Sequence, residues 1–305
     1  MNDLEIGLVN NMPDSALEAT ERQFRALIDA AADGMRVGLT LYALPDIPRS
    51  ESGQEQVSRY SDINDLWDRH LDGLIVTGTE PRAPNLKDEP YWGSFTRLLE
   101  WAERCTHSAV WSCLAAHAAV LQLDGISRRR LDDKRFGVFE CSRVSDHALM
   151  ASAPSRLLMP HSRWNDLPED ALTSCGYDVL TRSGAGVDAF AKKRKSLFVY
   201  FQGHPEYESE TLLLEYRRDV KRFLRGERET YPLIPQGYFD QDAVRMLTTM
   251  EERARSENRE QLIEEFPTDI LLARLTNRWR PAATSVYRNW LRYISAEQAR
   301  RLRSA

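Results

Sequence analysis

The stretch Val110–Ala119 reads VWSCLAAHAA, and the interpretation of the whole chain starts from it. An apolar run of strand type ends at Cys113, and an alanine-rich run of helix type begins directly after it. This order predicts a sharp turn that exposes the cysteine at the carboxyl end of a sheet strand. The start of a helix behind a thiol favours the thiolate and offers backbone N–H groups to an oxyanion. Cys113 is therefore a candidate nucleophile, and a buried, unreactive cysteine is the alternative.

A second stretch, Phe198–Tyr207, reads FVYFQGHPEY and predicts a strand that ends in a tight turn. The turn presents His204 and Glu206. A thiol nucleophile needs a base, and the base needs a third group that orients it. Because ligands bind at the carboxyl ends of parallel strands, we expect Cys113, His204 and Glu206 to meet at that edge as a catalytic triad. A Gly-His-Pro turn without a catalytic role is the alternative.

The rest of the chain alternates between strand and helix patterns. Six short apolar runs predict buried strands: Leu4–Val9, Val37–Leu44, Leu71–Thr77, Ser108–Ser112, Val179–Thr181 and Leu197–Phe201. Helical spacing of apolar residues follows the first and third runs. This alternation predicts an α/β fold with a doubly wound parallel sheet over residues 1–225. Charged helical patterning after that predicts a helical C-terminal extension, residues 226–305, packed on the core.

Composition and charge narrow the class of protein. The chain has 305 residues, of which 42% are hydrophobic and 29% charged, the balance of a globular protein. A net charge of −5 argues against nucleic acid and for small-molecule partners. We find no export signal and no apolar run long enough to span a membrane, so a cytoplasmic protein with reduced cysteines is expected. No cluster of His, Cys and carboxylate residues has metal-ligand spacing, so no metal is expected.

The two motifs together resemble those of class I glutamine amidotransferase-like domains, a flavodoxin-like fold in which GHPE follows an upstream strand-end cysteine. Further segments resemble the homoserine O-acyltransferase (homoserine trans-succinylase) family built on that domain. They are Ile6–Asp14 (IGLVNNMPD), Thr20–Phe24 (TERQF), Asp72–Gly78 (DGLIVTG), Tyr91–Trp92, Phe136–Glu140 (FGVFE), Pro160–Arg163 (PHSR) and Gly203–Asp219 (GHPEYESETLLLEYRRD). The likeness covers about residues 4 to 225, with a weaker match at Asn289–Leu291.

The resemblance implies chemical roles for the triad and for two residues on a probable helix. Cys113 would take the acyl group of an acyl-CoA as a thioester, with His204 as base and Glu206 as its orienting partner. Glu215 would lie near the substrate amine, and Arg218 would grip the amino-acid carboxylate. A zwitterionic substrate needs one group of each charge, and residues three apart share a helix face. A surface salt bridge is the alternative reading of this pair.

Three more substrate-binding residues follow from the same resemblance. Arg82 falls in the acyl-pocket segment, where it would pair with the free carboxylate of a succinyl group; solvent or the CoA phosphates are its other possible partners. Ser162 and Arg163, in the PHSR segment, complete the predicted substrate-binding set.

The active-site segments also depart from the family pattern. The family commonly has Met-Pro-x-Lys, whose lysine helps to polarise the acyl carbonyl, whereas Ser15 stands in this chain. The family's CWGAQ after the nucleophile becomes Cys113–His117, CLAAH. Loss of one oxyanion donor costs about 10²–10³ in rate unless another group replaces it. His117 is a candidate replacement, although at helical spacing it could equally face the interior.

These observations predict an acyl-CoA-dependent O-acyltransferase that acts on the hydroxyl of L-homoserine in methionine and sulfur amino-acid biosynthesis. The co-substrate would be succinyl-CoA in preference to acetyl-CoA, with no permanently bound cofactor, and the resemblance implies a homodimer. Three alternatives stay open: the same triad with another acceptor such as serine, an amidase or glutaminase activity, and a non-catalytic binding protein.

Overall fold

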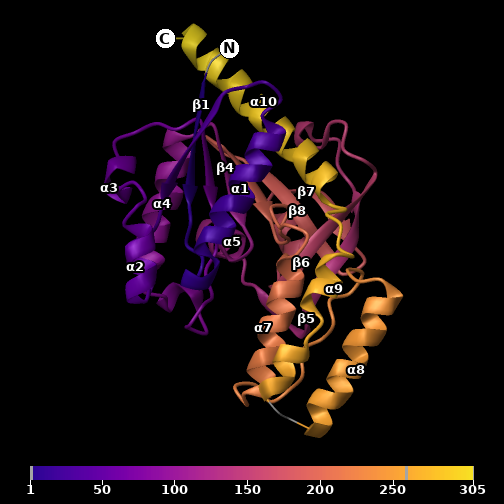
Figure 1. Cartoon of the computed structure of the whole chain (residues 1–305). Helices are drawn as coiled ribbons and strands as arrows, with labels where there is room; N and C mark the ends of the chain where they lie inside the picture. Colours follow the sequence, from indigo (N-terminus) through magenta and orange to yellow (C-terminus); the bar gives the residue numbers. More distant parts are fainter. Residues whose placement is uncertain (1–2, 258–259, 305) are drawn as a thin grey trace.

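The computed structural model describes residues 3–257 and 260–304 (Figure 1). Within these residues nine strands form one sheet in the order β2-β1-β3-β4-β9-β8-β7-β5-β6. The parallel half contains β1 (Leu4–Val9), β2 (Val37–Tyr42), β3 (Gly73–Val76), β4 (Ser108–Ser112) and β9 (Leu197–Phe201). The carboxyl ends of these strands share one edge, which is where the candidate active site lies.

The other half of the sheet is antiparallel. It contains β5 (Arg129–Arg143), β6 (Arg156–Asp166), β7 (Asp178–Ser183) and β8 (Gly186–Lys193), and β8 joins it to β9. The α/β prediction with a doubly wound sheet is confirmed, and all six predicted strands are present. The expectation of parallel strands alone was wrong for Val179–Thr181, which lies in β7, and β5, β6 and β8 were not predicted.

Helices α1 (Leu17–Ala31) and α10 (Arg280–Ser304) cover one face of the sheet and run beside each other in Figure 1. On α10, Trp290 and Ile294 are buried and contact Gly73 of β3. Burying a large apolar side chain contributes about 1.5–3 kcal/mol, so these residues fix α10 firmly on the sheet. The Trp290 indole also donates a hydrogen bond to Ser108 Oγ at 2.9 Å.

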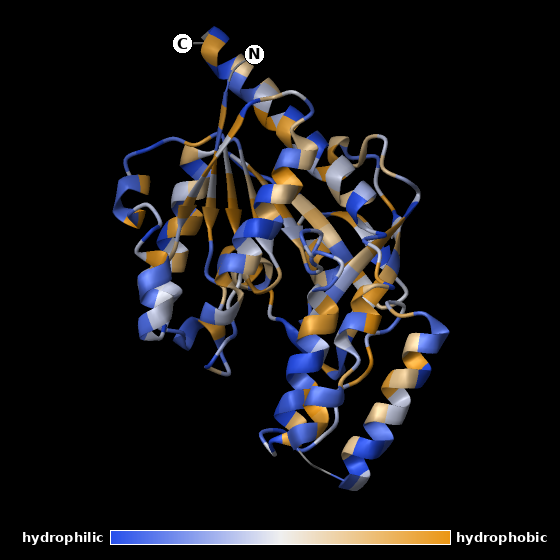
Figure 2. Ribbon diagram, in the orientation of Figure 1, coloured by the Kyte–Doolittle hydropathy of each residue, from blue (hydrophilic) through white to orange (hydrophobic). Residues whose placement is uncertain are grey.

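The opposite face is covered by helices that precede residue 175. Helices α4 (Trp92–Cys105) and α5 (Leu114–Asp124) pack there with α3 (Ile63–Leu66) and α6 (Glu169–Ser174). Alternate side chains of β1 and β3 enter the two face cores, as expected for strands buried on both sides. Figure 2 shows apolar strands at the centre and polar outer faces on the helices.

A third apolar cluster packs against the middle of β5. It joins Phe136 and Val138 to α7 (Thr211–Leu224), α8 (Gln241–Glu257) and α9 (Thr268–Leu272). The remaining short elements are α2 (Glu51–Val57) and the 3-10 turns η1 (Asp14–Ala16), η2 (Leu86–Asp88), η3 (Ala148–Met150) and η4 (Glu260–Glu265). Among the described residues, no helix is both long and apolar enough to cross a membrane.

Candidate active site

Cys113 occupies the turn between β4 and α5. Its backbone has φ 52° and ψ −111°, a conformation that residues with a side chain rarely adopt. A hydrogen bond of 2.7 Å from its N–H to the Phe201 carbonyl ties this turn to the end of β9. The thiol is half-buried. Backbone strain of about 1–3 kcal/mol is retained only where the surroundings enforce it, and here it holds the sulfur above the sheet edge.

Gly78 brings the loop after β3 against the start of α5. A Cβ on Gly78 would lie 2.9 Å from the Leu114 nitrogen, closer than real contacts allow, and 3.1 Å from the Ala115 nitrogen, closer than most. The first N–H groups of a helix have no partner within the helix. The start of α5 therefore offers N–H donors beside Cys113, and the missing side chain of Gly78 leaves room next to them, where an oxyanion would form on an attacked carbonyl.

His204 and Glu206 lie on the turn after β9. His204 Nδ1 and Glu206 Oε1 are 2.8 Å apart, and both side chains are buried. Burial acts to lower the pKa of His204, but the Cys113 thiolate and the Glu206 carboxylate outweigh it and raise the pKa well above its usual value. The three predicted triad residues therefore meet, and the electrostatic effect of Cys113 and Glu206 favours the imidazolium form of His204.

Glu215 and Ser162 meet beside the triad. Ser162 Oγ donates to Glu215 Oε2 at 2.5 Å, and Lys134 Nζ lies 3.8 Å from the same oxygen. Arg218, one turn further along α7, forms an ion pair with Asp219 at 3.0 Å and keeps 48% of its side chain exposed. Glu215 is thus fixed by a hydroxyl and a cation, whereas Arg218 stays accessible. Lys134 was missed because its place depends on the unpredicted strand β5.

Tyr207 connects the triad with Glu215, and sequence reasoning gave it no role. Its ring stacks on the His204 imidazole, with centroids 4.2 Å apart and planes 15° from parallel. Its hydroxyl donates to Glu215 Oε1 at 2.7 Å. Burial and then the Glu215 charge raise the pKa of Tyr207 well above its usual value, so the phenol stays a donor.

Arg163 does not share the Glu215 side of the site. It follows Ser162 on β6 and so points to the opposite face of the strand. Its guanidinium donates to Asp166 Oδ1 at 2.7 Å and to His161 Nδ1 at 3.2 Å, and the side chain is buried. The structure therefore joins this predicted substrate-binding residue to a buried ion network.

That network continues beneath the His204 turn. His161 Nε2 lies 3.4 Å from Asp188 Oδ1, which also accepts the Gly203 N–H at 3.2 Å. Cys141 completes a buried group whose potential metal-ligand atoms all lie within 4.8 Å of one another, a closeness that sequence spacing did not indicate. Because Asp188 and His161 are engaged by protein donors, this group is best explained as support for the turn that carries His204.

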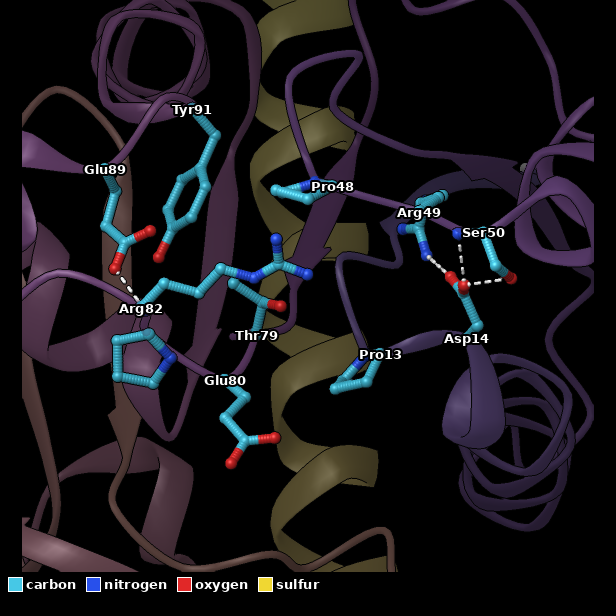
Figure 3. Close-up of a pocket in the computed structure, with 11 residues that line it drawn as sticks. Pro13, Asp14, Pro48, Arg49, Ser50, Thr79, Glu80, Arg82, Glu89 and Tyr91 are labelled. Carbon is cyan, nitrogen blue, oxygen red and sulfur yellow. Dashed lines mark hydrogen bonds and ion pairs between the residues drawn. The ribbon is translucent and has the colours of Figure 1, made fainter.

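Arg82 lies in a pocket of about 540 Å³, which Thr79 and Tyr91 also line. Its guanidinium extends into the pocket between Tyr91 and Arg49 (Figure 3). Buried Glu89 accepts the backbone N–H groups of Arg82 and Ala83 at 2.5 and 2.6 Å, which fixes the loop. Within the described residues the Arg82 guanidinium has no hydrogen-bond or ion-pair partner, so it is available to an anion.

The two candidates for the missing lysine do not fill its place. His117 is buried and bonded to Gln202 at 3.0 Å, and burial followed by the charge of Arg163 lowers its pKa to about 3, so it is a neutral core residue. Ser15 is exposed on η1. Arg128, just before β5, is half-buried. Burial lowers the pKa of its guanidinium, and the charges of Glu89 and Cys113 act to raise it. Sequence reasoning missed this cation because only the loop after α5 brings it near Cys113.

The fold and the Cys-His-Glu arrangement define the class of protein. The chain is similar in structure to a glutamine amidotransferase from Methylobacillus flagellatus, with a TM-score of 0.53, 13% identity and coverage of 96% of this chain and 95% of that one. It is also similar to a glutamine amidotransferase from Thermotoga maritima, with a TM-score of 0.50, 13% identity and coverage of 96% and 99%. At such identities the likeness establishes a glutamine amidotransferase-like fold.

Sequence comparison then gives the family. The family model described as homoserine O-succinyltransferase matches residues 1–301. The chain is 48% identical over 296 residues to the homoserine O-succinyltransferase of Rhodopseudomonas palustris, covering 96% of this chain and 89% of that protein. It is 45% identical over 294 residues to that of Methylorubrum extorquens, covering 96% and 87%. The chain belongs to the homoserine O-succinyltransferase family, as the sequence motifs predicted, and is a transferase.

Proposed function

We propose that this chain transfers a succinyl group from succinyl-CoA to the hydroxyl of L-homoserine, through a thioester on Cys113. One observation carries the proposal. In a chain of this family, Tyr207 links a Cys113–His204–Glu206 triad to Glu215, so an acyl carrier and a candidate amine-binding carboxylate belong to one site.

The first half-reaction loads the enzyme. The Cys113 thiolate attacks the thioester carbonyl of succinyl-CoA, and the negative charge on the carbonyl oxygen is met by the free N–H groups near Gly78 and Leu114. The carbon–sulfur bond to CoA then breaks, and His204 gives its proton to the departing CoA thiolate. Arg128 is the cation we infer to replace the family lysine beside the carbonyl.

The second half-reaction discharges the enzyme. Neutral His204 takes the proton from the homoserine hydroxyl as the oxygen attacks the Cys113 thioester. The ester forms, the carbon–sulfur bond to Cys113 breaks, and the thiolate is restored beside the imidazolium. Glu206, held 2.8 Å from Nδ1, keeps the ring oriented through both steps.

Opposite charges at the acceptor end suit an amino acid. Glu215, which already accepts two hydroxyl hydrogen bonds, would take the ammonium group. Arg218, half exposed and three residues further along α7, would take the carboxylate. Arg82 at the donor end supports succinyl over acetyl, because its unpartnered guanidinium would pair with the terminal carboxylate. Contact of Arg163 with substrate stays a prediction.

The experiment that tests the proposal is intact-mass spectrometry of the protein mixed with succinyl-CoA or acetyl-CoA, with Cys113→Ala as control. A succinyl adduct on wild type alone, discharged by homoserine, is expected. If serine discharged the adduct and homoserine did not, serine would be the acceptor. If acetyl-CoA formed the adduct faster than succinyl-CoA, the proposed role of Arg82 would be refuted. Absence of any adduct on folded protein would refute the transferase mechanism in favour of amide hydrolysis or binding. The cytoplasmic homodimer stays a prediction, tested by cell fractionation and sedimentation.

A further inference from the structure

Tyr207 is held from three directions. Its ring stacks on His204, and its hydroxyl donates to Glu215. Its backbone carbonyl accepts the Trp279 indole N–H at 2.8 Å and the Asn277 amide at 3.0 Å. The side chain is buried, so water does not compete for these contacts. Such a side chain has one position, and the two groups it touches are fixed relative to each other.

Those two groups have separate tasks in the second half-reaction. His204 must reach the acceptor hydroxyl, and Glu215 must reach the acceptor ammonium. The span between them sets how many carbons can separate the hydroxyl from the amine. Glu215 has a second hydroxyl donor in Ser162, but among the residues that the structure describes Tyr207 is the one that contacts both Glu215 and the imidazole ring.

We propose that Tyr207 is the positioning residue that selects the acceptor by length, holding the amine-binding carboxylate at a fixed span from the base. The inference rests on the proposed acyl transfer. The acceptor of the proposed function is a 4-hydroxy-2-amino acid, so an acceptor shorter by one methylene should satisfy the two groups less well. Without the phenol hydroxyl, Glu215 keeps Ser162 and Lys134 but gains freedom to approach His204. Discrimination against the shorter acceptor should therefore weaken.

Two variants of Tyr207 separate its contacts. Tyr207→Phe keeps the ring on the imidazole and removes the hydroxyl, whereas Tyr207→Leu removes both. A matched control is Tyr177→Phe, since the Tyr177 hydroxyl donates to the Asp124 carboxylate at 2.6 Å and its ring packs on aromatic neighbours in the α4/α5 face core. The control loses a comparable hydrogen bond at a place that has no contact with the triad.

The experiment measures single-turnover formation of the succinyl adduct, and then its discharge by homoserine and by serine. For Tyr207→Phe, discharge by homoserine should slow about 10- to 100-fold, the range for a lost hydrogen bond to a charged group. Adduct formation should slow less, and the homoserine-to-serine ratio of discharge rates should fall. Tyr207→Leu should also slow adduct formation, because the imidazole loses its stacking partner. Tyr177→Phe should keep the wild-type ratio.

An unchanged homoserine-to-serine ratio in Tyr207→Phe would overturn the inference while wild type still forms and discharges the adduct. Equal slowing of formation and discharge, with that ratio kept, would likewise leave Tyr207 a purely structural residue. Failure of wild type to form an adduct would instead overturn the proposed function on which the inference rests.

Discussion

Gly78→Ala is the substitution that most directly tests the geometry around Cys113. The new methyl would lie 2.5 Å from Leu114 Cβ and 2.9 Å from the Leu114 nitrogen. Neither atom belongs to the end of a flexible side chain, so the start of α5 or the loop after β3 must move. The backbone of Gly78 is not in the left-handed region, and the effect is therefore steric.

The magnitude follows from two consequences of that movement. Forcing a methyl group into a packed site costs about 1–3 kcal/mol of the free energy of unfolding. Displacing one N–H donor from a developing oxyanion lowers the rate by about 10²–10³. We therefore expect Gly78→Ala to remain folded and to form the succinyl adduct about 100-fold more slowly than wild type.

Rapid-quench intact-mass measurements give the rate of adduct formation, and urea unfolding gives the stability. Gly93→Ala is the matched control, because Gly93 lies in α4, is exposed, and a methyl group added there would meet no atom within 4 Å. Removing a helical glycine should raise its stability by about 0.5–1 kcal/mol and leave the rate unchanged. Adduct formation in Gly78→Ala within twofold of wild type would refute the role given to these N–H groups.

The remaining predictions concern charge and strain in the same site. In Glu206→Gln the carboxylate that raises the pKa of His204 is gone, so the imidazolium loses its proton at lower pH. The alkaline limb of the pH profile for adduct formation should therefore move to lower pH. An unmoved limb would contradict the role given to Glu206. Arg128→Met should slow adduct formation about 100-fold, and an unchanged single-turnover rate would exclude it as the lysine replacement. Cys113→Gly should be about 1 kcal/mol more stable than Cys113→Ala, because glycine tolerates φ 52°; urea unfolding that ranks alanine higher would remove the strain argument.

The sequence predicted the parallel half of the sheet because its strands are continuous apolar runs. Strand β5 was missed for the opposite reason: it carries charges along most of its length, since much of it faces solvent or the ion network around Asp166. A charged strand gives little periodic signal to read.

The candidate site residues also divide into those that a local sequence pattern marks and those that it does not. Cys113, His204 and Glu206 were predictable because strand ends and a tight turn mark them locally. Lys134 depends on where β5 passes, Arg128 depends on the loop between α5 and β5, and the Tyr207 contact depends on the position of α7, so no local pattern indicates them. His117 was ambiguous in the sequence, and its burial against Gln202 could be decided only by the packing of α5 on the sheet.

Helix α10 has a consequence for the order of events during synthesis. The ribosome makes β1, β3 and β4 long before Arg280, and α1 covers only part of their common face, because Trp290 and Ile294 of α10 pack on it at Gly73 of β3. Until α10 leaves the exit tunnel, the part of that face that α10 covers is an exposed apolar surface, which chaperones can bind and other nascent chains can join. This face of the sheet is therefore fully covered only after α10 has been translated. A message that stops before codon 280 would yield a chain prone to aggregation and proteolysis.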